Sequence, residues 1–212
     1  MDAHLIFEIV VIVASIAGAI SSYFSMRGRH FGLADLALLP NVLSALRLPL
    51  AVAFPFVVAN PRAALGVLVA AALTDVLDGW LARRRGQVTA VGAIVDPLGD
   101  KVFATTVVVT LLVRHDLPGW ALPALLAREI LEAPLVLWVL VSHSFRRARR
   151  TDARANIPGK LATVVQFVAV ISAIVVPEVL FAALIAAAVS GVLAGISYWH
   201  RELERLPNMR GA

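Results

Sequence analysis

The chain contains no cysteine. Disulfide bonds, thiolate chemistry and cysteine-based metal sites are therefore excluded. Charge is also scarce, because Asp, Glu, Lys and Arg make up only 16% of the 212 residues, whereas 60% of the residues are hydrophobic. The mean hydropathy is +0.86. These values exclude an ordinary soluble globule and predict an all-α polytopic membrane protein.

The chain has little acid to balance its bases, with a formal net charge of +5 and a pI near 10.7. In a membrane protein such an excess mostly marks cytoplasmic loops, so we expect no nucleic-acid partner. Long polar segments are absent as well. The longest is roughly residues 143–160, which leaves no room for a separate soluble domain.

Apolar runs long enough to cross a bilayer need about 20 residues. The first run carries no Lys or Arg ahead of it, unlike a secretory signal peptide. Residues 31–40 are too short to span and are expected to lie along the cytoplasmic surface as a short amphipathic helix. Seven spans are predicted, at residues 5–24, 42–58, 63–82, 93–113, 120–141, 161–176 and 179–199.

The distribution of basic residues predicts how these spans are oriented. Fourteen Lys and Arg residues fall in the loops and the tail that would be cytoplasmic, whereas only Arg62 and Arg114 fall in the outer loops. This positive-inside bias places the C-terminus and the Arg-rich turn at residues 83–87 in the cytoplasm.

Four carboxylates flank that turn, Asp75 and Asp78 before it and Asp96 and Asp100 after it. Their spacings of three and four residues put each pair on one face of a helix. Two helices that fold back across the turn would bring all four together. A charge inside a spanning helix costs about 3 kcal/mol, so such residues face a cavity or a partner.

Ion pairing and a cation or proton pathway are the alternatives to metal binding at these acids. The arginines at 83–85 sit in the turn, and only Lys101 is expected to lie at comparable depth, so pairing alone does not account for four acids. Hard divalent cations take carboxylate oxygens. Four carboxylates can hold two Mg²⁺ or Mn²⁺ ions, an arrangement used for displacement at phosphorus.

The depth of the acids suggests an enzyme that joins a lipid to a soluble molecule. Asp75 precedes the turn by about eight residues, and hence lies about 12 Å below it. Gly79 and Gly92 each remove a side chain near the acids, either to let a bulky ligand approach or to let helices pack.

The spacing of these residues resembles the signature of the CDP-alcohol phosphatidyltransferases, and the segment Asn41-Val-Leu-Ser44-Ala-Leu-Arg47 resembles the start of that family's first core helix. The resemblance implies a six-helix core over residues 31–200. Residues 1–30 would add one N-terminal transmembrane helix with a basic linker, and residues 201–212 a cytoplasmic tail. The signature reads Asp75-x-x-Asp78-Gly79-x-x-Ala82-Arg83, eight residues, then Gly92-x-x-x-Asp96-x-x-x-Asp100.

The resemblance also implies a reaction. The hydroxyl of an alcohol attacks a CDP-linked lipid, usually CDP-diacylglycerol, and CMP leaves. By similarity the four acids would hold two divalent ions, and Asp100 would also take the hydroxyl proton. The residues implied to border the CDP-lipid are Asn41, Gly79, Ala82, Arg83, Thr89 and Gly92.

Two further segments resemble the bacterial phosphatidylglycerophosphate synthases, Ala127-Arg128-Glu129-Ile130 and Gly159-Lys160-x-x-Thr163-x-x-Gln166. They imply that Arg128 and Lys160 bind the phosphate of glycerol 3-phosphate. Arg128 could instead pair with Glu132, and Lys160 could be one more positive-inside charge. CMP-forming cardiolipin synthases share much of the pattern and use phosphatidylglycerol, and inositol phosphate or serine are other possible acceptors.

The resemblance further implies a homodimer among membrane lipids, in a bacterial inner membrane with the active site facing the cytoplasm. A cation transporter is the alternative from a different class. A cation path would not need Ala82, Arg83 or the two glycines of the signature.

Replacement of the expected base gives a direct test. We predict that Asp100→Asn yields a folded membrane protein without transfer activity, because the amide cannot accept the hydroxyl proton. CMP release by purified protein measures the effect, and turnover near that of the wild type would refute the assignment.

Overall fold

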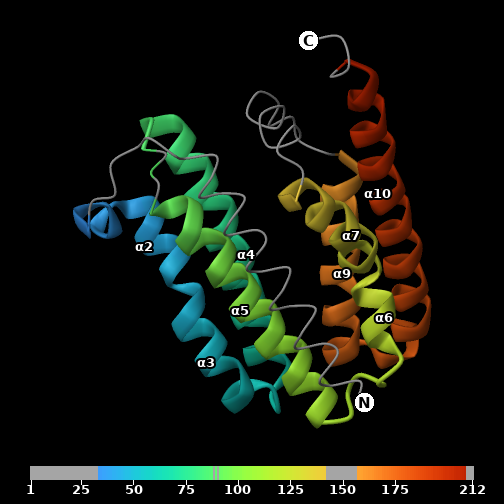
Figure 1. Ribbon diagram of the computed structural model, residues 1–212. Helices are drawn as coiled ribbons and strands as arrows, with labels where there is room; N and C mark the ends of the chain where they lie inside the picture. The colour runs from blue at the N-terminus through green and yellow to red at the C-terminus, as the bar shows by residue number, and fades with distance from the viewer. Residues whose placement is uncertain (1–32, 88, 90, 142–156, 209–212) are drawn as a thin grey trace. The chain divides into compact units, whose positions relative to one another are not determined.

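The computed structural model describes residues 33–87, 89, 91–141 and 157–208, and all of the regular secondary structure in these ranges is helical (Figure 1). The predicted span at residues 5–24 lies outside the described residues, as does most of the basic loop. The all-α fold class is confirmed.

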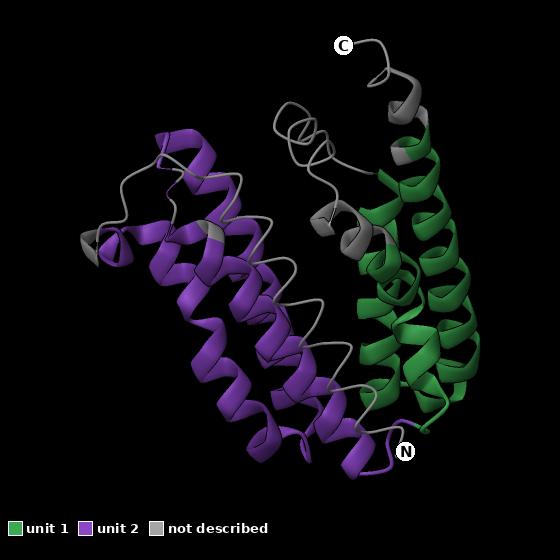
Figure 2. Cartoon of the chain, viewed as in Figure 1, with its two compact units in different colours: residues 1–10, 118–212 green, residues 11–117 purple. Residues whose placement is uncertain are grey.

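The chain divides into two compact units (Figure 2). Unit 2 comprises residues 11–117, and unit 1 comprises residues 1–10 and 118–212. Each unit is a bundle of helices with its own buried apolar residues, such as Phe54 and Leu111 in unit 2 and Leu184 in unit 1. The expected division into residues 1–30, 31–200 and 201–212 stays a prediction.

Unit 2 carries the signature acids on two long helices. Helices α2 and α3 meet at Leu46, and both pack against α4 and α5. The short helix expected at residues 31–40 is a 3₁₀ turn, η1. The elements are η1 (Leu33–Ala37), α2 (Leu39–Ala45), α3 (Arg47–Val57), α4 (Pro61–Arg85) and α5 (Gly92–Val113).

Capping residues set the two ends of α4. The Asn60 side chain accepts hydrogen bonds from the backbone N–H groups of Arg62 and Ala63, and Pro61 occupies the first turn. At the other end Gly86 adopts a left-handed conformation with φ 62°. The three arginines at 83–85 therefore form the last helical turn, where their charge favours the negative end of the helix dipole, rather than a loop.

Unit 1 is organised around its last helix, which packs on α9, α7 and α6. Glycines allow the closest approach, since a Cβ on Gly195 would lie 2.7 Å from the Cβ of Leu131. The elements are α6 (Ala121–Leu125), α7 (Ala127–Val141), α9 (Ile157–Val175), η3 (Pro177–Val179) and α10 (Leu180–Asn208).

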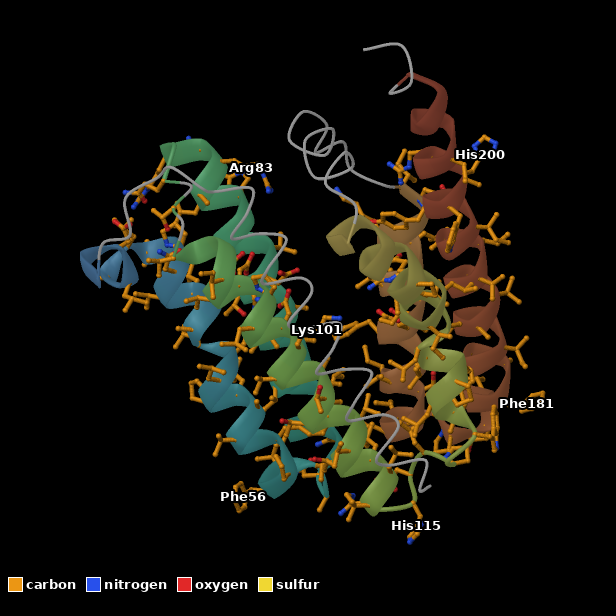
Figure 3. All side chains as sticks on the ribbon, in the orientation of Figure 1. Phe56, Arg83, Lys101, His115, Phe181 and His200 are labelled. Carbon is orange, nitrogen blue, oxygen red and sulfur yellow. The ribbon has the colours of Figure 1, made fainter. Side chains whose placement is uncertain are left out.

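Four stretches in the described part of the chain are long and apolar enough to cross a membrane, Leu39–Val57, Pro61–Arg85, Ile157–Val175 and Pro177–Arg201. Large apolar side chains project outward from them, including Phe56 at 82% and Phe181 at 65% exposure (Figure 3). Such surfaces suit lipid, and the protein is an integral membrane protein. Helix α5 is of similar length but carries Asp96, Asp100 and Lys101; the number of spans in the core stays a prediction.

Close packing of α5 on α2 at Gly99 can be tested by substitution. A Cβ on Gly99 would lie 3.0 Å from the carbonyl oxygen of Ser44. We expect Gly99→Ala to lower the free energy of unfolding by about 1–3 kcal/mol, because the backbone oxygen cannot move aside as a flexible side chain can. Denaturant unfolding in detergent measures the change.

Gly66→Ala on α4 is the matched control. Nothing lies within 4 Å of the Cβ position there, so the variant should gain up to about 1 kcal/mol from helix propensity. Equal stability of the two variants would contradict the close contact at Gly99.

Candidate active site

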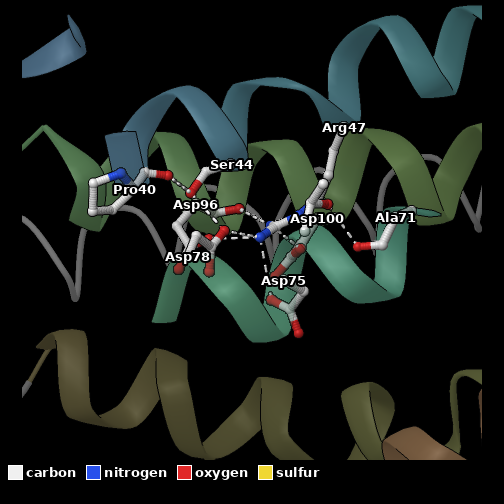
Figure 4. Close-up of polar contacts among 9 residues, drawn as sticks. Pro40, Ser44, Arg47, Ala71, Asp75, Asp78, Asp96 and Asp100 are labelled. Atoms are coloured by element: carbon white, nitrogen blue, oxygen red, sulfur yellow. Dashed lines mark hydrogen bonds and ion pairs between the residues drawn. The ribbon is translucent and has the colours of Figure 1, made fainter. Parts of the chain in front are cut away.

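The four acids of the signature come together on facing helices of unit 2 (Figure 4). Helix α4 supplies Asp75 and Asp78, and α5 supplies Asp96 and Asp100. One carboxylate oxygen each from Asp75, Asp78 and Asp96 lie within 4.8 Å of one another. The convergence expected from the spacing is therefore present in the structure.

A buried arginine lies among these acids. Arg47, the first residue of α3, is only 1% exposed. Its Nη2 lies 3.3 Å from Asp75 Oδ1 and 3.1 Å from Asp96 Oδ1, and it also pairs with Asp78 Oδ2. Its Nη1 pairs with Asp100 Oδ1. One guanidinium thus contacts all four carboxylates.

This contact corrects the expectation that only Lys101 lies at the depth of the acids. That expectation was wrong, because among the described residues the ion pairs of the four acids all go to Arg47. The sequence feature that could have indicated Arg47 was the spacing of Asn41, Ser44 and Arg47, which are three residues apart and so share one face of a helix. A charged residue on one face of an apolar helix needs a partner, and the partners here are distant in sequence.

Ser44 is a second residue that sequence reasoning did not assign to the site. Its hydroxyl donates to Asp78 Oδ2 at 2.7 Å, and it also lies 3.1 Å from the Pro40 carbonyl. Asp78 is 3% exposed overall, whereas the side chains of the other acids are 55% (Asp75), 44% (Asp96) and 48% (Asp100) exposed. Asp78 is therefore anchored, and three carboxylates remain accessible to a ligand.

The donor set fits a divalent cation. Four carboxylates face one guanidinium, which leaves three negative charges uncompensated if all four are ionised. Carboxylate oxygens are the ligands that Mg²⁺ and Mn²⁺ prefer. The acids of α4 and α5 could therefore hold a metal ion despite their contacts with Arg47.

Asn41, Thr89 and Gly92 form a connected group at the start of α5. The Nδ2 of Asn41 donates to the Asp35 carbonyl at 2.7 Å and to Thr89 Oγ1 at 3.1 Å, and Thr89 Oγ1 also accepts from Gly92 N at 3.0 Å. A Cβ on Gly92 would lie 2.4 Å from Asn41 Oδ1. In this structure Gly92 thus makes room for Asn41, and its role toward a CDP-lipid remains a proposal.

Gly79 makes room for another candidate residue. A Cβ there would lie 3.2 Å from Arg83 Nη1, so the Arg83 guanidinium lies back along α4 over Gly79. Ala82 and Arg83 lie in the last part of α4, beyond the acids.

The two segments expected at the acceptor come together within unit 1. Arg128 Nη1 donates to Thr163 Oγ1 at 2.8 Å and to the carbonyl of Gly159, the neighbour of Lys160, at 3.2 Å. Arg128 also pairs with Glu129 at 2.8 Å and with Glu132 at 3.8 Å. The alternative pairing with Glu132 is therefore present alongside the contact between the segments.

Gln166 makes a further contact between the segment around Arg128 and helix α9. Its Nε2 donates to the Leu125 carbonyl at 2.6 Å, where α6 ends before α7. Gln166 was part of the motif but carried no expected role. In the structure it ties α9 to the segment that leads into Arg128.

Fold and site together define an integral membrane protein with a carboxylate cluster on helices α4 and α5. Residues 37–194 match the CDP-alcohol phosphatidyltransferase family. The chain therefore belongs to this family, and membership favours a transferase over the alternative of a cation transporter.

Three bacterial proteins whose names describe their reactions are similar to the chain. The chain is 33% identical over 197 residues to a probable phosphatidylglycerophosphate synthase of Mycobacterium tuberculosis (86% of this chain, 90% of the relative). It is 37% identical over 113 residues to the CDP-diacylglycerol–glycerol-3-phosphate 3-phosphatidyltransferase of Escherichia coli K12 (52% and 59%). A CMP-forming cardiolipin synthase of Streptomyces coelicolor is 35% identical over 133 residues (59% and 59%). No solved structure matches significantly.

The contact between Asn41 and Gly92 generates a double-mutant test. Gly92→Ala should destabilise the protein by about 1–3 kcal/mol. The methyl group would overlap Asn41 Oδ1, and the Asn41 side chain could move aside only by losing its hydrogen bonds to Asp35 and Thr89. Asn41→Ala removes that oxygen, so Asn41→Ala with Gly92→Ala should be more stable than the sum of the single changes predicts, by at least about 0.5 kcal/mol. Unfolding of the four proteins in detergent measures the coupling, and strict additivity would contradict the contact.

Proposed function

We propose that the protein transfers a phosphatidyl group from CDP-diacylglycerol to glycerol 3-phosphate and releases CMP. The observation that carries this proposal is the convergence of Asp75, Asp78, Asp96 and Asp100 at family spacing on two spanning-length helices. Names of the relatives support the donor and the acceptor.

Each acid has a part in the proposed mechanism. Asp75, Asp78 and Asp96 would hold divalent metal, with a contribution from Asp100. Bound metal would supply charge stabilisation to the pyrophosphate and to the departing CMP. We expect the four acids to hold two divalent ions, Mg²⁺ or Mn²⁺.

Asp100 would act as the base. One of its oxygens faces Arg47, while the side chain is 48% exposed and so reachable by a hydroxyl. The acceptor oxygen forms a bond to the phosphorus next to the diacylglycerol, and the bond from that phosphorus to the oxygen bridging to CMP breaks. The hydroxyl proton passes to Asp100, and CMP leaves with the bridging oxygen.

Arg83 and the group formed by Asn41, Thr89 and Gly92 would border the cytidine diphosphate, with Gly79 and Ala82 on the same helix as Arg83. Arg128 and Lys160 would bind the phosphate of the acceptor. The hydrogen bonds from Arg128 to Gly159 and Thr163 support a joint role, because they hold the two acceptor segments together. A phosphate would compete with Glu129 for the Arg128 guanidinium.

The proposal also covers the orientation of the protein in the membrane and its oligomeric state. The Arg-rich end of α4 and the basic tail favour a cytoplasmic face for the active site in a bacterial inner membrane. Residues 5–24 would add a span to the core, and a homodimer is expected from the family resemblance.

A panel of acceptors tests the reaction. Purified protein with CDP-diacylglycerol and Mg²⁺ or Mn²⁺ should release CMP with glycerol 3-phosphate and stop releasing it with a chelator. Phosphatidylglycerol, inositol phosphate and serine should give little CMP. CMP with phosphatidylglycerol alone would establish the cardiolipin synthase alternative, and no CMP with any alcohol would refute the transferase.

Arg128→Ala tests the acceptor site. We expect the KM for glycerol 3-phosphate to rise by about tenfold or more, because a charge-assisted contact to phosphate contributes about 1.5–3 kcal/mol. The KM for CDP-diacylglycerol should change little. Thr163→Val, which removes one Arg128 partner and keeps the charge, is the control and should have a smaller effect. An unchanged KM for glycerol 3-phosphate in Arg128→Ala would show that Arg128 does not bind the acceptor.

A further inference from the structure

Arg47 pairs with the same three carboxylates that could share a metal ion. Its Nη2 lies within 3.3 Å of one oxygen of Asp75 and of Asp96, and it also pairs with Asp78. These are the three residues whose carboxylate oxygens could share a metal ion. A metal ion held by these three carboxylates would lie a few ångströms from the Arg47 guanidinium, so the two positive charges would repel each other.

We propose that Arg47 is a tethered counter-cation that holds the carboxylates together without metal and competes with divalent cations for them. The inference rests on the metal site of the proposed function and adds a positioning residue to it. A residue that supports metal ligands usually raises the affinity for the metal. The positive charge of Arg47 instead lowers the affinity of the carboxylates for a metal ion.

The need for such a counter-cation follows from the surroundings. Asp78 is buried with Ser44 and Arg47 as its partners. Several ionised carboxylates at this separation repel one another, and a buried charge without a partner is strongly unfavourable. Arg47 offsets this repulsion from within the chain, so the helices can pack before any metal binds.

The two terminal nitrogens of Arg47 have different partners, so a metal ion can replace one nitrogen while the other keeps its contacts. Nη2 contacts the three convergent acids, whereas Nη1 pairs with Asp100 and lies 3.4 Å from the main-chain oxygen of Asp96. A metal ion held mainly by Asp75, Asp78 and Asp96 competes chiefly for the contacts of Nη2. Arg47 can then retain Asp100 through Nη1, and its charge stays in the site.

The test compares Mn²⁺ binding by the full-length wild type and Arg47→Gln, both purified in detergent. Electron paramagnetic resonance measures the free Mn²⁺. We expect Arg47→Gln to bind Mn²⁺ about tenfold or more tightly, because a positive charge a few ångströms from the ion is removed. Without metal the variant should unfold at a lower temperature than the wild type, and Mn²⁺ should raise its Tm by more.

Arg114→Gln is the matched control. Arg114 pairs with Asp116 at 2.9 Å, away from the acid cluster and half-exposed. Its loss should leave the affinity for Mn²⁺ unchanged. Arg47→Lys, which keeps the charge in a more compact group, should bind Mn²⁺ with an affinity between those of the wild type and Arg47→Gln.

The outcomes separate this inference from the proposed function. A wild type that binds no Mn²⁺ would overturn the metal site itself. A wild type that binds Mn²⁺, with equal or weaker binding by Arg47→Gln, would overturn the counter-cation role alone. If Arg47→Gln does not fold, Arg47→Gln combined with Asp100→Asn is compared with Asp100→Asn, and the same tightening is expected.

Discussion

One buried guanidinium shared by four carboxylates is the interaction on which unit 2 depends. Arg47 reaches the acids from α3, whereas the acids come from α4 and α5. The ion pairs therefore connect three helices, α3, α4 and α5. Arg47 is 1% exposed, and a buried charge is strongly unfavourable unless it is paired with a charge of the opposite sign. The guanidinium and the carboxylates therefore stabilise each other.

Small residues bring the backbones close enough for these ion pairs. Gly99 lies against the Ser44 carbonyl, and Gly92 lies against Asn41. The hydroxyl of Ser44 then reaches Asp78 directly. Bulkier residues at these positions would separate α2 from α5. The separation would reach the carboxylates, because α5 carries Asp96 and Asp100 and α2 carries Ser44, which donates to Asp78.

The signature acids and the acceptor segments belong to different units. This division suits a family in which one donor chemistry serves several alcohols. The names of two relatives point to different reactions, one a CMP-forming cardiolipin synthase and the other a transferase acting on glycerol 3-phosphate. Under the proposed function, variation around Arg128, Gly159 and Thr163 would alter the acceptor without disturbing the carboxylates.

The fold class, four stretches of spanning length and the meeting of the four acids could all be predicted from the sequence. These features are local along the chain: hydropathy marks the apolar stretches, and spacing places Asp75 with Asp78 and Asp96 with Asp100 on helix faces. The residue that lies among the acids could be found only from the packing of the helices. Arg47 is 28 residues before Asp75 in sequence, and its pairing depends on which face α3 turns toward α4 and α5, a property of packing rather than of spacing.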